Sequence, residues 1–174
     1  LTTNNIFSLK AVLPLSFQNA FIGDVLPGGV YFVKIQVQSG KTDNSLVDIW
    51  YGSDNELERK NYPATREVYY LWEPSKKRVR QIGNDDLSYT ISMGNDRYFL
   101  CYNPYILQDY TSYNPHLKLY IYDALNNEYS FLDTIPKEFY VSWDGKYLII
   151  NGENGWNLID ISAGSKKTIP LKCF

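Results

Sequence analysis

The stretch Ser142-Trp143-Asp144-Gly145-Lys146-Tyr147-Leu148-Ile149 repeats Ser92-Met93-Gly94-Asn95-Asp96-Arg97-Tyr98-Phe99-Leu100, with one residue gapped. Upstream of these, Val68-Tyr69-Tyr70-Leu71-Trp72-Glu73 has the same relation to Lys118-Leu119-Tyr120-Ile121-Tyr122-Asp123. A third, shorter copy is Asn157-Leu158-Ile159-Asp160. Short apolar strands and turns that recur every ~40–50 residues are typical of propeller blades. The repeat predicts an architecture and leaves the function open.

The pattern predicts an all-β, antiparallel fold of three propeller-like four-stranded blades in a single domain, 1–174. The three repeats are residues 30–83, 84–136 and 137–174. The first repeat has expected strands near 30–37, 46–51, 68–72 and 78–82. The second has them near 87–93, 98–102, 118–122 and 128–132, and the third near 139–143, 147–150, 156–161 and 167–171. Residues 1–29 form either a partial blade, with strands near 5–13 and 20–26, or a loose arm.

Turn residues support this spacing. Asp144-Gly145 is a two-residue hairpin signal, because glycine can take the positive φ of a primed turn. Asn126-Asn127 lies at the hairpin between the third and fourth strands of its repeat. The connection between second and third strands is long in the first two repeats, at 52–67 and 103–117, and short in the third, at 151–155.

Composition limits the function classes. The chain has 174 residues, including 16 Tyr, 8 Phe and 4 Trp, residue types that strands favour. Its net charge of −2 argues against a nucleic-acid partner, which needs a positive field. No apolar run has the ~20 residues of a membrane span. The sequence begins at Leu1, so a leader could have been removed or the chain trimmed, and we expect an extracytoplasmic or secreted location. Cys101 and Cys173 form either one disulfide or two buried thiols.

The run from Ser142 to Leu148 resembles the Ser-Pro-Asp-Gly-Lys-x-Leu hairpin of TolB-like and WD-repeat-like propeller repeats, with Trp143 in the place of proline. The copies that end in Glu73, Asp123 and Asp160 look like the third strand of such blades. The second repeat has a looser turn, and the first replaces it with a longer polar turn at 39–45. The resemblance covers residues 30–174. It implies a propeller fold and a tendency to bind proteins, peptides or sugars, with no common catalytic residues.

No residue pattern predicts catalysis, a cofactor or a metal site. His116 is the only histidine, and no Gly-x-Ser-x-Gly elbow accompanies it. Most of the available carboxylates occupy turn positions, where they bond to the local backbone; they are Asp109, Asp123, Glu128, Asp133 and Asp144. We therefore expect a protein that is not an enzyme.

The tyrosine-rich loop 102–113 is the candidate ligand-binding segment. Large rigid rings beside amide and hydroxyl groups are typical of recognition surfaces; the candidates are Tyr102, Tyr105, Gln108, Tyr110 and Tyr113. Alternatively, these rings pack over the sheet end as a lid. The resulting hypothesis is a non-enzymatic binding or sensing module for a protein, peptide or glycan. The alternative is an accessory propeller domain or fragment of a larger hydrolase.

Three blades fall short of the ring that known propellers form, in which about four or more blades close. The first and last sheets would then each expose an apolar flank, which soluble monomers rarely tolerate. We therefore expect a possible homodimer that completes a propeller, in which blade one of each chain meets blade three of the other.

Overall fold

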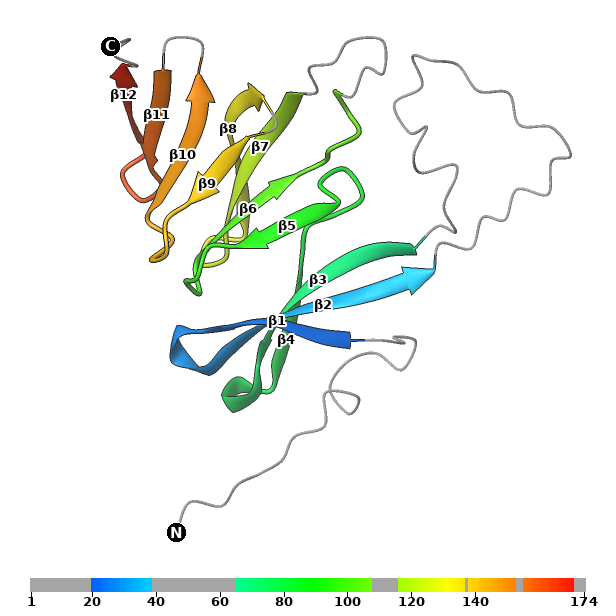
Figure 1. Cartoon of the computed structure of the whole chain (residues 1–174). Helices are drawn as coiled ribbons and strands as arrows, with labels where there is room; N and C mark the ends of the chain where they lie inside the picture. The colour runs from blue at the N-terminus through cyan, green and yellow to red at the C-terminus, as the bar shows by residue number, and fades with distance from the viewer. Residues whose placement is uncertain (1–19, 39–64, 108–115, 137, 153–154, 171–174) are drawn as a thin grey trace, which may run out of the picture.

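The computed structural model describes residues 20–38, 65–107, 116–136, 138–152 and 155–170. These form three four-stranded antiparallel sheets that follow one another along the chain (Figure 1). Sheet 1 contains β1 (Ala20–Leu26), β2 (Val30–Gln38), β3 (Thr65–Glu73) and β4 (Arg78–Ile82). Sheet 2 contains β5 (Tyr89–Ser92), β6 (Tyr98–Tyr102), β7 (His116–Asp123) and β8 (Glu128–Pro136). Sheet 3 contains β9 (Phe139–Val141), β10 (Tyr147–Gly152), β11 (Gly155–Asp160) and β12 (Ser165–Pro170).

Sheets 2 and 3 confirm the strands predicted for the second and third repeats, whereas the first repeat needs a correction. Its sheet begins at β1, so Ala20–Leu26 is the first strand of sheet 1 and not part of a separate arm or partial blade. The hairpin turn is Pro27–Gly29, where Gly28 has φ 73°, and not the polar turn at 39–45. β2 pairs directly with β3, with Ile35 opposite Val68. The expected strands at 5–13 and 46–51 lie outside the described residues.

Every sheet has two apolar faces, and we name them by the direction in which they point. The forward face points toward the next sheet along the chain, and the backward face points the other way. The register fixes equivalent backward-face pairs, in which a residue of the second strand lies opposite one of the third. These pairs are Val33 with Tyr70, Cys101 with Tyr120, and Ile150 with Asn157.

Two seams hold the sheets together, and both join a forward face to a backward face. At the first seam, Phe32 of sheet 1 stacks on Phe99 of sheet 2, with ring centroids 5.8 Å apart. At the second seam, the forward face of sheet 2 packs against Leu148 and Ile159 of sheet 3. Each fully buried side chain of this size stabilises the fold by about 1.5–3 kcal/mol. The seams therefore form the core.

The two ends of the stack differ in exposure. On the backward face of sheet 1, Val33 and Ile35 are 0% exposed, in a cluster whose described members all belong to sheet 1. On the forward face of sheet 3, Tyr140 is 59% exposed and Ile169 is 46% exposed. The expectation of two exposed flanks is therefore wrong for sheet 1 and correct for sheet 3. A homodimer contact through the flank of sheet 1 loses its basis.

The acidic residue at the end of the third strand has a local structural role. The Asp123 carboxylate accepts a hydrogen bond from the backbone N–H of Leu125 at 2.9 Å. Asp160 does the same for the N–H of Ala163, also at 2.9 Å. These bonds close the turns before β8 and β12, so the repeated Asp is explained by turn formation.

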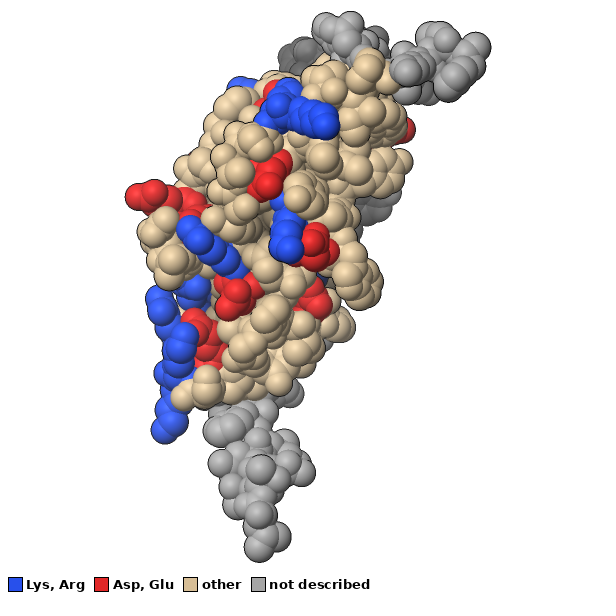
Figure 2. Space-filling view, turned by 90° about the vertical axis from the view of Figure 1, so that its left-hand side faces the viewer, with Lys and Arg blue, Asp and Glu red and all other residues tan. Residues whose placement is uncertain are grey.

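No helix in the described part of the chain has the length and hydrophobicity needed to cross a bilayer. Charges of both signs are interspersed over the side of the molecule that Figure 2 shows, and Lys and Arg side chains gather along its lower left edge.

Candidate functional site

A cleft opens at the second seam, between sheets 2 and 3, and we call it the seam cleft. It lies where β7 and β11 begin and where β8, β10 and β12 end. Its volume is about 390 Å³, which is within the range of small-molecule sites. Polar side chains predominate in its lining: His116, Asp133, Thr134, Asn151, Asn157, Lys166 and Thr168, with Ile135, Pro136, Ile150 and Gly152.

Asn157 explains why this seam is open. It occupies the backward-face position that Tyr70 and Tyr120 hold in the other two sheets, so an amide stands where the others have a ring. Its side chain is only 9% exposed. The shorter side chain leaves room at the seam that a tyrosine would fill.

Neighbouring groups fix the Asn157 amide in place. Thr168 Oγ1 donates a hydrogen bond to Asn157 Oδ1 at 2.7 Å. On the other side, a Cβ added to Gly152 would stand 2.3 Å from Asn157 Nδ2, so this amide lies directly against the glycine. A buried amide held by such contacts presents a fixed hydrogen-bonding group, as recognition sites require.

Charged side chains form the rim of the seam cleft. Lys166 Nζ lies 2.7 Å from Asp133 Oδ2, so this ion pair joins β12 to β8 across the seam. Such a partly exposed pair contributes about 0–1 kcal/mol to stability, so its main effect here is to position a cation and an anion. His116, the first residue of β7, adds an imidazole to the same lining. The rim can thus both donate and accept hydrogen bonds.

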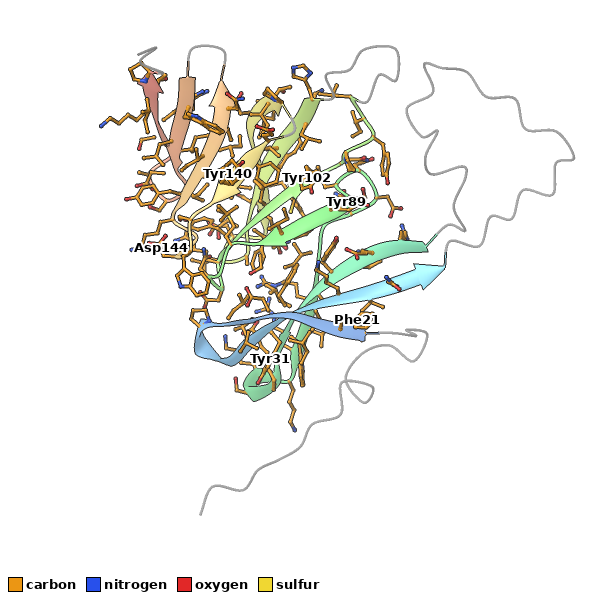
Figure 3. The ribbon with its side chains drawn as sticks, in the orientation of Figure 1. Phe21, Tyr31, Tyr89, Tyr102, Tyr140 and Asp144 are labelled. Carbon is orange, nitrogen blue, oxygen red and sulfur yellow. The ribbon has the colours of Figure 1, made fainter. Side chains whose placement is uncertain are left out.

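An aromatic row leads to the seam cleft and includes two of the predicted site residues. Tyr102 stacks on Tyr89, with ring centroids 5.7 Å apart, and meets Phe139 of sheet 3 edge-on at 5.9 Å (Figure 3). Tyr105 belongs to the same row, with its ring centroid 6.4 Å from that of Tyr89. Phe139 pairs with Ile150, which lines the cleft. Burial is the main reason that the pKa of the Tyr102 hydroxyl is raised.

The structure therefore places Tyr102 and Tyr105 in one packed row, in which both rings contact Tyr89. Both side chains are half-buried. The remaining candidates, Gln108, Tyr110 and Tyr113, lie outside the described residues.

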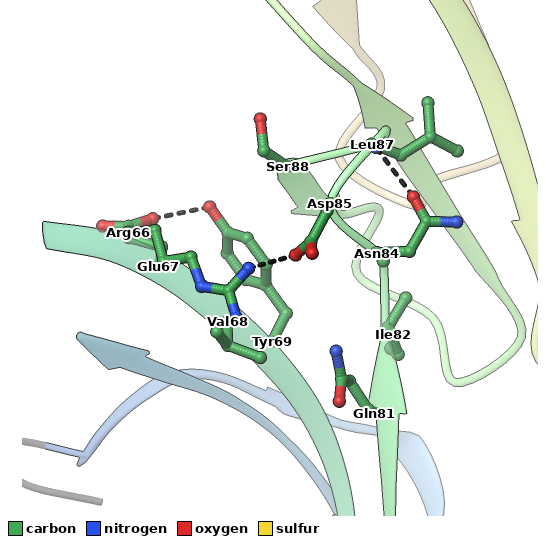
Figure 4. Close-up of a pocket in the computed structure, with 11 residues that line it drawn as sticks. Arg66, Glu67, Val68, Tyr69, Gln81, Ile82, Asn84, Asp85, Leu87 and Ser88 are labelled. Atoms are coloured by element: carbon green, nitrogen blue, oxygen red, sulfur yellow. Dashed lines mark hydrogen bonds and ion pairs between the residues drawn. The ribbon is translucent and has the colours of Figure 1, made fainter. Parts of the chain in front are cut away.

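The first seam has a much smaller pocket at the corresponding place, where β3 begins and β4 ends (Figure 4). Its volume is about 30 Å³, enough for about one water molecule. An ion pair between Arg66 and Asp85 borders it, and Tyr69 donates a hydrogen bond to Glu67 at 2.5 Å. Burial and the adjacent carboxylate raise the pKa of Tyr69. Of these two pockets, the seam cleft is the one with space for a larger ligand.

The described residues contain no cluster of metal-ligating side chains, and their one cysteine is buried. No three His, Cys, Asp or Glu side chains there come together as a metal site. Cys101 is a free, buried thiol, and burial raises its pKa to about 12, so the thiol is protonated at neutral pH. Its suggested partner Cys173 lies outside the described residues.

No protein-family model matches this sequence, and no curated protein is significantly similar to it. The chain is therefore classified by its structure: it is an all-β protein of stacked four-stranded antiparallel sheets.

The seam cleft was not predicted from the sequence. Its lining combines Asp133 and His116 of the second repeat with Lys166 and Asn157 of the third. The sequence predicts Asp133 as one of the available carboxylates, most of which occupy turns, and His116 as a surface-loop histidine, with neither of them part of a cleft. One signal was present, since Asn157 replaces the Tyr found at this position of the repeat.

Proposed function

We propose that this chain is a non-enzymatic binding module that takes a peptide or a glycan at the seam cleft. The observation that carries the proposal is the polar cleft of about 390 Å³ between sheets 2 and 3. Its fixed amide, its charged pair and its imidazole suit a ligand rich in hydroxyl or amide groups. The aromatic row beside the cleft offers ring surface for the apolar parts of such a ligand.

Lys166 and Lys167 provide a matched pair for the test. They are neighbours on β12, but Lys166 lines the seam cleft while Lys167 pairs with Leu158 and belongs to the opposite face. The experiment measures the melting temperature of the wild type, Lys166→Ala and Lys167→Ala against a panel of oligosaccharides and short peptides. A ligand that binds only the folded state stabilises it by about 2.7 kcal/mol at a hundredfold excess over Kd.

The expected result is that a hit raises the melting temperature of the wild type and Lys167→Ala equally, and that of Lys166→Ala much less. The proposal fails if no compound raises the melting temperature. It also fails if the two lysine variants respond alike.

A second candidate function is an accessory propeller domain of a larger hydrolase. The open forward face of sheet 3 favours it, because a further sheet could stack there as sheets 2 and 3 stack on their predecessors. The native open reading frame distinguishes the two candidate functions. A catalytic domain encoded beside these 174 residues supports the second candidate.

The propeller assignment is part of the same proposal. Three observations support it. The three sheets follow one another in chain order, and both seams join a forward face to a backward face. Sheet 3 also has the TolB-like hairpin. A homodimer, though not one that closes a ring through sheet 1, and a place outside the cytoplasm are also proposals. Since the backward face of sheet 1 is buried, a dimer contact has to use sheet 3.

A further inference from the structure

Positive charge is concentrated on the hairpin that joins β3 to β4 in sheet 1. Four of the 17 Lys and Arg residues of the chain fall within five consecutive positions, as Lys76, Lys77, Arg78 and Arg80. The first three are exposed, and Arg80 is half-buried. This hairpin is the lowest described part of the chain in Figure 1, and Lys and Arg side chains gather along the lower left edge of Figure 2. We call residues 73–80 the basic hairpin.

One carboxylate neutralises part of this charge. Glu73 is 7% exposed, and Lys76 Nζ lies 2.5 Å from its Oε2. The hydrogen bond from Lys76 is the main reason that the pKa of Glu73 is lowered, and the charges of Arg78 and Arg80 act in the same direction. Glu73 is therefore ionised at neutral pH. With four cations and one anion, the basic hairpin has a net charge of +3.

Arg80 fixes the basic hairpin against sheet 2. Its Nη1 donates a hydrogen bond to the carbonyl of Ala124, in the turn between β7 and β8. The carboxylate that precedes this turn, Asp123, is already bound by Arg97. Lys77 and Arg78 form no ion pair with any residue that the structure describes. These two cations are therefore available to an external anion.

We propose that the basic hairpin binds an acidic polysaccharide, a linear glycan that carries negatively charged groups along its length. The cations follow one another along a single exposed turn, which matches a slender chain with closely spaced negative charges. An exposed ion pair contributes little by itself and is weakened by salt, so binding requires several pairs at once. A chain of linked anionic groups supplies them, whereas a single small anion does not.

The charge on the rest of the molecule limits the shape of the partner. Since the whole chain has a net charge of −2, the residues outside the basic hairpin have a net charge of −5. A flat anionic membrane or a wide nucleic-acid duplex would also meet acidic side chains, which Figure 2 shows interspersed on the same face. A single glycan chain can follow the hairpin alone.

The basic hairpin is separate from the seam cleft. It belongs to sheet 1, whereas the cleft opens between sheets 2 and 3 and none of residues 73–80 lines it. The two sites can therefore be tested independently, with variants at different positions.

Isothermal titration calorimetry with dextran sulfate tests the proposal, and uncharged dextran is the control polymer. At low salt the wild type should bind dextran sulfate and not dextran, and added NaCl should weaken the binding. The double variant Lys77→Gln with Arg78→Gln removes the two available cations, so it should bind dextran sulfate about tenfold or more weakly. Both side chains are exposed, and circular dichroism checks that the variant folds.

The matched control is the double variant Lys118→Gln with Lys167→Gln. It removes the same two charges at exposed positions of β7 and β12, so it should bind dextran sulfate as the wild type does. A wild type that does not bind dextran sulfate at low salt overturns the proposal, and so does an equal loss of affinity in the two double variants. Binding to phosphatidylserine vesicles or to a DNA duplex as tight as that to dextran sulfate would show that the partner is not a glycan.

Discussion

Gly145 of sheet 3 lies directly against the backbone of Met93 in sheet 2, and a Cβ added to Gly145 would stand 1.7 Å from the Met93 carbonyl oxygen. Asn95 Nδ2 also donates a hydrogen bond to the carbonyl of Gly145, at 3.4 Å. The two hairpin tips that carry the sequence repeat are therefore in contact. The turn residue that predicted a hairpin also permits the close approach of two sheets.

Replacing Gly145 with alanine should destabilise the fold by about 2 kcal/mol or more. The new Cβ meets backbone that cannot move aside, and the residue has φ 65°, which alanine adopts only with strain. Urea denaturation measures the loss. Gly164→Ala is the control, because Gly164 has φ 62° with nothing within 4 Å of the added Cβ. It should cost only about 1 kcal/mol, and an equal cost at the two positions would show that the contact with Met93 is unimportant.

Tyr102→Ala should lower the free energy of unfolding by about 2–3 kcal/mol, because the ring packs on both Tyr89 and Phe139 across the second seam. Trp143→Ala removes a larger ring that is fully exposed and should change stability by less than about 0.5 kcal/mol. Chemical denaturation of the two variants compares them. A Tyr102→Ala protein as stable as the wild type would mean that the aromatic row does not belong to the core.

Stability should fall in acid in part because of Asp123. Arg97 holds this carboxylate with three hydrogen bonds, from Nε to both carboxylate oxygens at 3.2 Å and from Nη2 to Oδ2 at 2.9 Å. The hydrogen bond with Arg97 lowers the pKa of Asp123 in the folded protein, and its burial opposes that shift less strongly. Since the folded pKa lies below the unfolded one, the stabilisation is complete above the unfolded pKa, near ~4, and is lost as the pH falls through the folded value.

The measurement is the free energy of unfolding as a function of pH. The wild type should lose stability more steeply below about pH 4 than Asp123→Asn, whose side chain does not titrate. Arg97→Gln should show an intermediate slope, because it removes the largest cause of the lowered pKa while the hydrogen bond from the Leu125 N–H remains. Parallel curves for all three proteins would contradict this assignment.

Cys101 should resist alkylation while the protein is folded. Its thiol is buried, lies 3.6 Å from Thr90 Oγ1, and has a pKa raised to about 12. In a Cys173→Ser variant Cys101 is the single thiol, and labelling with iodoacetamide, followed by mass spectrometry, should become rapid only after unfolding in urea. Rapid labelling of the native protein would show that the first seam opens readily.

Local signals were enough to predict two of the three sheets. The turn at Asp144-Gly145 and the terminal Asp123 and Asp160 act through bonds within a few residues, so they are visible in the sequence. The sequence predicts β1 at its observed position, 20–26, but assigns it to an arm or a separate partial blade, because no copy of the repeat marks it as the first strand of sheet 1. The seam cleft depends on contacts between repeats, which no local pattern encodes. Asn157 alone, as an exception to the repeat, pointed to it.

The forward-to-backward seams give the stack a direction, and that direction bears on how such a chain can evolve. A duplicated repeat added after β12 would bring a backward face to the open forward face of sheet 3 without disturbing any described contact. A repeat added before β1 would first have to expose Val33 and Ile35, which are already buried. Growth of this architecture by duplication is therefore easier at its carboxyl-terminal end, one repeat at a time.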